Sequence, residues 1–477
     1  MTRDLAIQLT RHRSVTNSPG ETFFGPFLQD LLSSWPELSH VEKLRTILGD
    51  PYERYNIIAL KRSGTPTRRT ILLTGHYDVV STANYGPDLE PLCTDPDLLR
   101  PALAAADPAL APDLTTGGFL PGRGLLDMKA GLAAGLTVLR QYEGPGNILF
   151  AAVPDEEVAS YGMRSLVRQL PDLCAQLGLD IELAINLDAE GDPGDGSRGR
   201  AIFWGSVGKL LPLVVFIGRP SHAGAPFDGI NPAFLQAEFV RLVDANPELG
   251  DTHKGAPAPP VVLYARDTRT HYDVTTPQAS YCAVNVLTHT LDAAQVMGKF
   301  RNVAAECLRV AIETLERRSG RRMPWAPVVH VLEGLEHLPV EACAAAIQQR
   351  AGALGIQGPA AILALASPYY PKVQWQSTDA TLADAIKQAR DRIVARFGTS
   401  ITDRPYFPGI SDMSFLNAYP TVNIGPWGRE YHQRGERVHE QYAFEVLPAL
   451  LQEVCETVLS REALETPPQS TTPPPAE

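Results

Sequence analysis

The chain has 477 residues, of which 44% are hydrophobic and 20% are charged, as is typical of a globular protein with more than one domain. Its formal net charge of −12 argues against nucleic acid or an anionic membrane as a partner, because both require clustered Lys and Arg. There is no run of about 18 apolar residues, no signal-peptide core and no CxxC pair among the six cysteines, so we expect a cytoplasmic protein with free thiols.

The first 203 residues alternate between helix-like and strand-like segments. Small residues at helical spacing predict a helix over 128–140. Short apolar runs predict strands at 57–60, 70–74, 148–153 and 183–187. This alternation predicts an α/β fold with a mostly parallel sheet sandwiched by helices, and residues 1–203 form the first part of that catalytic domain. A Pro- and Ala-rich stretch at 85–118 interrupts it, which we expect to be a surface insertion with one or two helical turns.

The pattern changes after residue 203. Strands and helices over 204–358 predict a smaller α+β domain inserted into the first one, which we expect to serve as a lid and dimerisation domain. The chain then returns to the catalytic domain over 359–466, with a helix that begins near residue 376 and a strand at 420–425. The tail, residues 467–477, is rich in Pro, Ser and Thr and is expected to be disordered.

Charged side chains stand where the predicted strands end. The stretch VPDEEVASYG places three adjacent carboxylates directly after one strand, and they repel one another unless positive charge lies nearby. Other acids and histidines follow strands or precede helices at His76, Asp78, Asp127, Asp188, Glu190 and His439. Ligand sites form beyond the C-terminal ends of such strands, and imidazole with carboxylate suits Zn²⁺ or a similar divalent ion. Two such ions would offset the crowded negative charge.

Six segments, in order along the chain, resemble the zinc-dependent exopeptidase and deacylase family, which includes peptidase T, carboxypeptidase G, aminoacylase and acetylornithine deacetylase. They are LLTGHYDVV, GRGLLDMKAG, VPDEEVASYG, INLDAE, GRPSHAGAP and GERVHEQYAFEVLP. The segments SVGKLLPLVVFIGRPSHAGAPFDGINP and SPYYP are most similar to the family's arginine-utilisation branch. The resemblance implies a homodimer with two divalent ions, Zn or alternatively Co or Mn.

The same resemblance implies a role for individual residues. The implied ligands are His76 and Asp188 for one ion, Glu157 and His439 for the other, and Asp127 as a bridge between both. Glu156 would act as the general base, taking a proton from the attacking water and passing it to the leaving amine. Asp78 would fix the tautomer of His76 by a hydrogen bond. His222 would bind the oxyanion, often in the site of the neighbouring subunit.

Two ligand positions have rivals in the sequence. Glu190 competes with Asp188, which we favour because it directly ends the strand. His432 competes with His439, which we favour because its spacing to Phe444 matches the family pattern better. An Arg of the small domain holds a substrate carboxylate in the family, and Arg266 and Arg269 are candidates from position alone.

The expected function is metal-dependent hydrolysis of an amide bond in a short peptide or an N-acyl amino acid, with a link to arginine or amino-acid catabolism. The alternative is a non-catalytic metal-binding or regulatory protein that retains the fold. Because the whole ligand set and the base Glu156 are present, we favour the enzyme. The insertion at 85–118 either narrows the cleft or is a solvated loop without a role.

Overall fold

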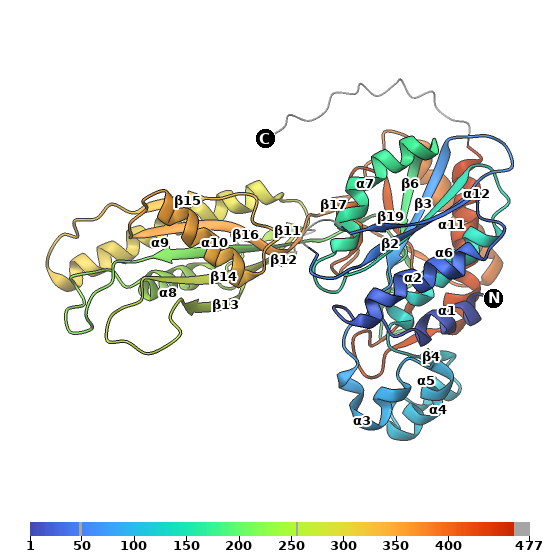
Figure 1. Ribbon diagram of the computed structural model, residues 1–477, viewed down its shortest axis with the longest axis horizontal. Helices are drawn as coiled ribbons and strands as arrows, with labels where there is room; N and C mark the ends of the chain where they lie inside the picture. The colour runs from blue at the N-terminus through green and yellow to red at the C-terminus, as the bar shows by residue number, and fades with distance from the viewer. Residues whose placement is uncertain (47–49, 254–255, 462–477) are drawn as a thin grey trace.

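The computed structural model describes residues 1–46, 50–253 and 256–461, which form a large and a small domain (Figure 1). The large domain is built on an eight-stranded sheet in the order β1-β2-β5-β3-β6-β19-β8-β18. Its strands are β1 (His40–Arg45), β2 (Tyr55–Lys61), β3 (Arg69–His76), β5 (Asn147–Val153), β6 (Asp180–Asn186), β8 (Ala201–Phe203), β18 (Thr402–Arg404) and β19 (Thr421–Asn423). The tail at 467–477 lies outside the described residues.

The centre of this sheet is parallel, as the sequence predicts. Strands β5, β3, β6 and β19 run side by side in the same direction, and His76 pairs with Val153 at the end of β3 and β5. The outer strand β2 is antiparallel to both of its neighbours. The C-terminal ends of the parallel strands therefore meet at one edge, where ligand sites form in sheets of this kind.

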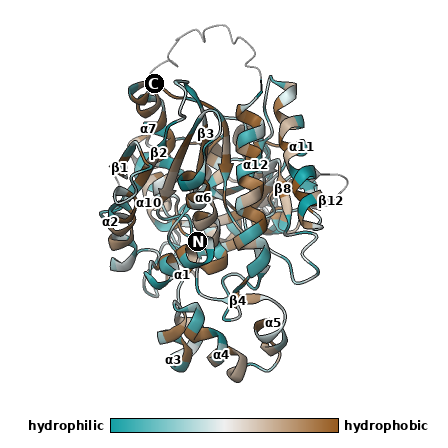
Figure 2. Cartoon of the chain, turned by 90° about the vertical axis from the view of Figure 1, so that its right-hand side faces the viewer, coloured by the Kyte–Doolittle hydropathy of each residue, from teal (hydrophilic) through white to brown (hydrophobic). Residues whose placement is uncertain are grey.

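Helices cover both faces of the large sheet because its strands are apolar on both sides. Ile57 and Ala59 of β2 belong to one buried cluster, whereas Ile58 and Leu60 belong to another on the opposite face. The first cluster is completed by α1 (Thr2–Arg11), α2 (Pro19–Ser33), α6 (Ala130–Gln141), α11 (Ala380–Phe397) and α12 (Leu447–Leu459). The second is covered by α7 (Tyr161–Leu177). Helices α11 and α12 carry both brown and teal segments in Figure 2, as amphipathic helices on a sheet do.

Helix α6 approaches the sheet closely, as its small residues predict. A Cβ atom added at Gly131 would lie 2.2 Å from the carbonyl oxygen of Leu187, directly after β6. One added at Gly135 would lie 2.6 Å from the Leu187 side chain. The absence of side chains at these positions is therefore what lets α6 lie against the strand that leads to Asp188.

The small domain is a five-stranded sheet, β13-β14-β10-β16-β15, with helices on both faces. Its strands are β10 (Gly208–Ile217), β13 (Val261–Asp267), β14 (Ala279–Thr288), β15 (Val328–Val331) and β16 (Ala360–Tyr370). Helices α8 (Pro232–Val243) and α9 (Ala293–Ser319) pack on one face and α10 (Val340–Ala353) on the other. Because β16 pairs with β10 along its whole length, the small domain extends to Tyr370, beyond the boundary at 358 that the sequence suggested.

Three smaller sheets complete the described part of the fold. Four short strands form the order β4-β21-β20-β7, with β4 at Phe119–Pro121, β21 at Arg437–His439, β20 at Trp427–Arg429 and β7 at Glu190–Gly191. Strands β9 (Gly205–Ser206) and β17 (Val373–Gln374) pair where the chain enters and leaves the small domain. Strands β11 (Asp251–His253) and β12 (Ala256–Ala258) pair with each other.

The insertion contains more helix than the one or two turns expected. Residues 83–118, called the helical insertion below, contain α3 (Gly86–Leu89), α4 (Pro96–Ala106) and α5 (Ala111–Thr115). They enclose a core of their own, made of Tyr85, Leu89, Cys93, Leu99, Leu103, Leu110 and Leu114. The insertion forms a separate lobe below the large sheet in Figures 1 and 2. No helix of the described residues is long and apolar enough to span a membrane.

Candidate metal centre

His76 ends β3 with its ring fixed in one orientation. Its Nδ1 atom lies 3.0 Å from the backbone carbonyl oxygen of Asp78, and because a carbonyl can only accept, Nδ1 carries the proton. The Nε2 atom then faces the space beyond the sheet edge. It lies 3.1 Å from Asp127 Oδ1 and 3.9 Å from Asp188 Oδ1. A buried imidazole nitrogen with two carboxylates beside it is a suitable ligand for a divalent ion.

Asp78 orients His76 through its backbone carbonyl and not, as the sequence predicts, through its carboxylate. Its carboxylate is 3.5 Å from His76 Nδ1 and instead accepts hydrogen bonds from the backbone N–H groups of Glu156 and Glu157, at 3.1 and 3.3 Å. The hydroxyl of Thr16 donates a further bond to it at 2.8 Å. Asp78 thus orients His76 with its backbone and the turn after β5 with its side chain.

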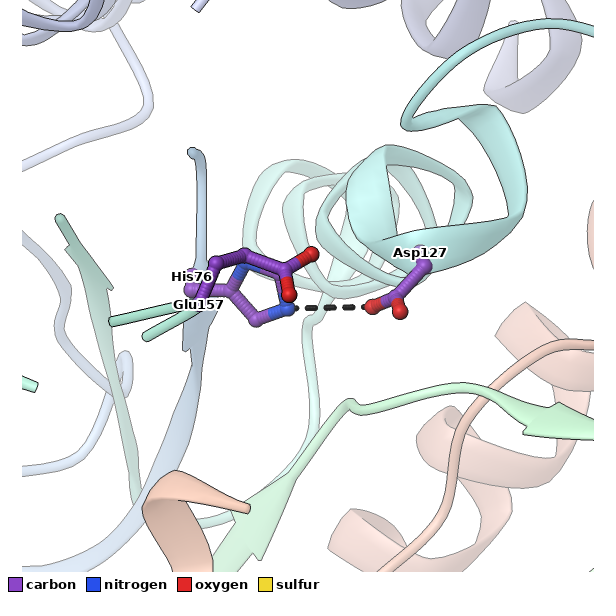
Figure 3. A group of neighbouring side chains, drawn as sticks. All are labelled: His76, Asp127 and Glu157. Atoms are coloured by element: carbon purple, nitrogen blue, oxygen red, sulfur yellow. Dashed lines mark hydrogen bonds and ion pairs between the residues drawn. The ribbon is translucent and has the colours of Figure 1, made fainter. Parts of the chain in front are cut away.

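Asp127 lies between two histidines. Its Oδ1 faces His76, and its Oδ2 lies 3.0 Å from Nε2 of His432. The same His432 nitrogen is 3.2 Å from Glu157 Oε2. Figure 3 shows Asp127 facing the His76 ring, with the Glu157 carboxylate extended toward the same point. Donor atoms of His76, Asp127 and Glu157 all lie within 4.8 Å of one another.

The structure reverses the choice between His439 and His432. The His439 ring stacks on Trp427 with centroids 4.7 Å apart and meets Phe119 edge-on, and its Nδ1 accepts a hydrogen bond from the backbone of Tyr442. It makes no hydrogen bond or ion pair with the acids of the site in the part of the chain that the structure describes. His439 belongs to β21, which pairs with β4 and so turns the ring into this aromatic cluster.

Asp188 lies at the site and its rival Glu190 does not. The backbone N–H of Asp188 donates to Asn423 Oδ1 at 3.1 Å, and Asn423 Nδ2 donates back to the Asp188 carbonyl at 2.9 Å. These two bonds fix the chain directly after β6 so that the Asp188 carboxylate approaches His76. Glu190 lies two residues further on in β7, which pairs with β20.

The carboxylates are crowded in a buried space. Burial, together with the neighbouring Asp188 and Glu157 charges, raises the pKa of Glu156 well above its usual value. Burial and the Asp127 charge raise the pKa of Asp188 to about 7. Burial opposes ionisation of Asp127 as well, but hydrogen bonds from His432 and His76 outweigh it and hold its pKa well below the usual range. The crowding favours a positive partner for these groups.

One carboxylate oxygen of Glu157 has no hydrogen-bond partner among the described residues. Glu157 Oε1 is buried and accepts no hydrogen bond, whereas Oε2 faces His432. An unpaired buried carboxylate oxygen is costly, and a bound cation would supply the missing interaction. The chemistry of the donor set also fits, since it offers two imidazole nitrogens and several carboxylate oxygens.

A cavity of about 270 Å³ opens onto these groups. Its lining from the small domain includes Lys209, Pro368 and Tyr370. Its lining from the large domain includes Asp127, Glu156, Glu157, Asp188, Tyr431 and His432. The Tyr370 hydroxyl donates to the backbone carbonyl of Glu156 at 3.1 Å and accepts a bond from Ser160. Lys209 is the one ammonium group among the lining residues and makes no hydrogen bond or ion pair with any described residue. Burial lowers its pKa.

Sequence reasoning missed Lys209 and Tyr370 as site residues. Both lie within segments quoted for the family resemblance, SVGKLL and SPYYP, but nothing in either segment shows which side chain faces the cavity. The expected carboxylate-binding residues lie elsewhere: Arg269 pairs with Asp267, and Arg266 bonds to the Tyr264 hydroxyl. Neither arginine lines the cavity.

His222 lies in the small domain and is exposed. Its Nδ1 accepts a hydrogen bond from the backbone of Gly224 at 3.0 Å, and its backbone pairs with Thr275. It does not line the cavity within its own chain. The arrangement therefore brings together His76, Asp78, Asp127, Glu156, Glu157 and Asp188, adds His432, and leaves out His222 and His439.

Residues 72–459 match the family model described as Peptidase family M20/M25/M40. The chain belongs to this peptidase family. The M20 family is metal-dependent, and the chain is accordingly a metallohydrolase. It is similar to Protein RocB of Bacillus subtilis (strain 168), with 28% identity over 94% of this chain and 93% of RocB. YqjN of the same strain is 26% identical over 94% of each chain.

Solved structures, among them one described as an M20 peptidase, share the fold. A tripeptidase from Staphylococcus aureus superposes with a TM-score of 0.61 at 17% identity, covering 96% of this chain and 98% of that one. The YXEP protein of Bacillus subtilis, described as a dinuclear metal-binding peptidase, superposes with a TM-score of 0.55 at 16% identity, covering 96% and 97%. The predicted α/β fold and family resemblance are thereby confirmed.

Proposed function

We propose that this M20 metallohydrolase binds two divalent metal ions and cleaves an amide bond in a short peptide or an N-acyl amino acid. The observation that carries the proposal is the position of Asp127, whose two oxygens each face a different histidine, at 3.1 and 3.0 Å. His76 and Asp188 would complete one ion's ligands, and His432 and Glu157 the other's. Zn²⁺ suits this donor set best, with Co²⁺ or Mn²⁺ as alternatives.

The spacing of the donors supports this assignment. Two atoms bonded to one tetrahedral ion at about 2.0–2.1 Å lie about 3.3 Å apart. The contacts of His432 Nε2 with Asp127 and Glu157 are 3.0 and 3.2 Å, and that of His76 Nε2 with Asp127 is 3.1 Å. Asp188 is the exception at 3.9 Å from His76. Small side-chain rotations would bring all five residues to bonding geometry.

The site has the groups that amide hydrolysis needs. Divalent ions bound there would polarise the substrate carbonyl and lower the pKa of an attacking water. Glu156 lines the cavity without serving as a ligand, and its carboxylate would take the proton of that water and pass it to the leaving amine. Asp78 holds the Glu156 backbone N–H and Tyr370 holds its carbonyl, so the base is fixed from both sides.

The cavity supports a small substrate with a negative group. A volume of about 270 Å³ suits a dipeptide-sized or acylated amino acid and not a folded protein. Lys209 is free to pair with a substrate carboxylate. The solved tripeptidase with the same fold and the resemblance to the arginine-utilisation branch both support a peptide or amino-acid amide, including one from arginine catabolism.

Metal content and hydrolysis together test the proposal. Elemental analysis of gently purified protein should find two ions per chain, and an amide panel should show cleavage that a chelator abolishes and added metal restores. Glu156→Gln should keep both ions while losing about 100-fold or more in kcat, since general-base catalysis contributes about that much. Loss of metal in that variant would make Glu156 a ligand instead of the base. Two ions without cleavage of any amide would favour the alternative, a metal-binding protein that retains the fold.

A further inference from the structure

The segment that carries His432 has an unusual backbone. Residues 430–436, called the histidine loop below, connect β20 to β21. Glu430 and His432 have φ angles of 56° and 64°, in the left-handed region that residues other than glycine rarely adopt. Such a conformation persists only where the surrounding structure holds it. The contacts of the histidine loop identify the part of the molecule that holds it.

The helical insertion contacts the histidine loop at His432, Arg434 and Gly435. Asn84 Nδ2 donates to the backbone carbonyl of His432 itself at 2.9 Å. Asp107 pairs with Arg434 at 3.2 Å. Leu110 packs against Gly435, where an added Cβ would lie 3.1 Å from Leu110 Cδ1.

The two ends of the loop are held by one aspartate of the insertion. Asp113 pairs with Arg429, the last residue of β20, and with Arg437, the first residue of β21, in each case at 2.7 Å. Arg437 has only 5% of its side chain exposed, so this pair is largely shielded from water. Arg100 of the insertion forms a further ion pair with Glu440, just beyond the loop.

A buried pair links the loop to the bridging aspartate. Arg123 is fully buried, bonds to Asn84 Oδ1 at 2.8 Å and pairs with Glu436 in the loop. Glu436 Oε1 in turn accepts hydrogen bonds from the backbone of Gly124 at 2.8 Å and of Asp127 at 3.4 Å. The insertion, the loop and the turn that carries Asp127 therefore form one connected network.

We propose that the helical insertion is a scaffold that positions His432, and that Asn84 and Asp113 are its positioning residues. No residue of 83–118 lines the cavity, so the insertion does not cover the substrate. It instead holds the loop in the conformation in which His432 Nε2 reaches Asp127 and Glu157. The scaffold would thereby set the affinity for one of the two metal ions, and this consequence rests on the proposed function.

The double variant Asn84→Ala, Asp113→Asn tests the scaffold. Metal-stripped protein is titrated with Co²⁺, whose absorption spectrum reports each site, and the variant should bind one ion as the wild type does and the other roughly 10- to 100-fold more weakly. Asp97→Asn is the matched control, because Asp97 lies in α4 but pairs with Arg3 and Arg11 of α1. It should leave both affinities unchanged.

Hydrogen–deuterium exchange of the metal-free proteins separates the scaffold from the proposed function. Exchange at residues 430–436 should be faster in the double variant and unchanged in Asp97→Asn. If both Co²⁺ affinities and the exchange of the loop match the wild type, the scaffold is refuted. If the wild type binds fewer than two ions, the proposed function fails, and loop exchange still decides whether the insertion holds the loop. Thermal unfolding midpoints confirm that each variant is folded.

Discussion

Removal of His432 and removal of His439 should give different metal counts, because only His432 lies beside Asp127. His432→Ala should leave about one ion per chain, because the ion held with Glu157 loses its only imidazole. His439→Ala should keep both ions, since that ring stacks on Trp427 and only its packing is lost. Elemental analysis after dialysis against metal-free buffer measures both variants. Two ions in His432→Ala together with one in His439→Ala would restore the choice made from sequence.

The position of Lys209 in the cavity predicts that a free carboxylate on the substrate contributes to kcat/KM. Lys209→Met keeps the length of the side chain and removes the charge, so kcat/KM for amides with a free carboxylate should fall about 10- to 100-fold, as expected for loss of a bond to a charged group. The matched amides with that carboxylate blocked should react equally with both proteins. Metal content should not change, because Lys209 contacts none of the proposed ligands. An equal loss on both substrate series would argue against a carboxylate contact.

The choice of His439 shows where sequence reasoning about single residues fails. His432 and His439 are seven residues apart, the first before β21 and the second at the end of that strand, and motif spacing favours the second. His432 has a left-handed backbone and contacts the helical insertion. Both features depend on the tertiary structure, so motif spacing cannot reveal them. By contrast, sequence places His76, Glu157 and Asp188 at one sheet edge, because His76 ends β3 and the other two lie shortly after the ends of β5 and β6.

At the scale of elements, the close approach of α6 to Leu187 predicts that one substitution in this helix lowers both the stability of the fold and the metal affinity of the site. Gly131→Ala would place a Cβ atom 2.2 Å from the Leu187 carbonyl, so the helix or the end of β6 must shift. The free energy of unfolding should fall by about 1–3 kcal/mol, as in other overpacked cores. Because Asp188 follows Leu187 directly, metal affinity should fall as well. Calorimetry and Co²⁺ titration measure the two effects.

Gly298→Ala is the matched control for that prediction. Gly298 lies within α9 of the small domain, and an added Cβ would have no atom within 4 Å. Alanine there should raise the free energy of unfolding by about 0.5–1 kcal/mol, because glycine loses more backbone entropy in a helix. Its metal affinity should equal that of the wild type. If the two glycine variants have equal stabilities and equal metal affinities, the close approach of α6 to Leu187 is not required for either property.

Strands and helices can be predicted from sequence where their local hydrophobic pattern agrees with their burial in the fold. The apolar runs at β3, β5 and β6 are buried on both faces, and their uninterrupted character identifies central strands. The helical content of the insertion is underestimated from sequence because its prolines look like loop residues, whereas Pro96 starts α4 and Pro101 lies inside that helix. The boundary near 358 was misplaced because β16 is just as apolar as a strand of the large sheet, and pairing alone assigns it to the small one.

At the scale of the whole molecule, the exposed edge of the small domain supports a homodimer. Strand β13 ends the five-stranded sheet, and its Val261 and Leu263 side chains are 45% and 60% exposed. Such an edge offers unpaired backbone groups and apolar surface to a second chain. Sedimentation equilibrium should therefore report a dimer, and Leu263→Lys should weaken it. A monomer at every concentration that retains full activity would exclude this assembly.

A dimer also gives His222 a site to act on, because this residue does not line the cavity of its own chain. His222→Ala should lose about 100-fold or more in kcat while keeping its metal, as for loss of an oxyanion donor. Mixing it with Glu156→Gln should then restore activity, because a mixed dimer has one site with both an intact base and the partner's imidazole. In a fully exchanged equal mixture the recovery should approach about a quarter of the wild-type rate, since half of the dimers are mixed and each has one complete site. A tagged chain verifies that subunits have exchanged. If exchange is complete and the mixture stays inactive, His222 acts within its own chain, and the small domain must then close over the cavity to bring it there.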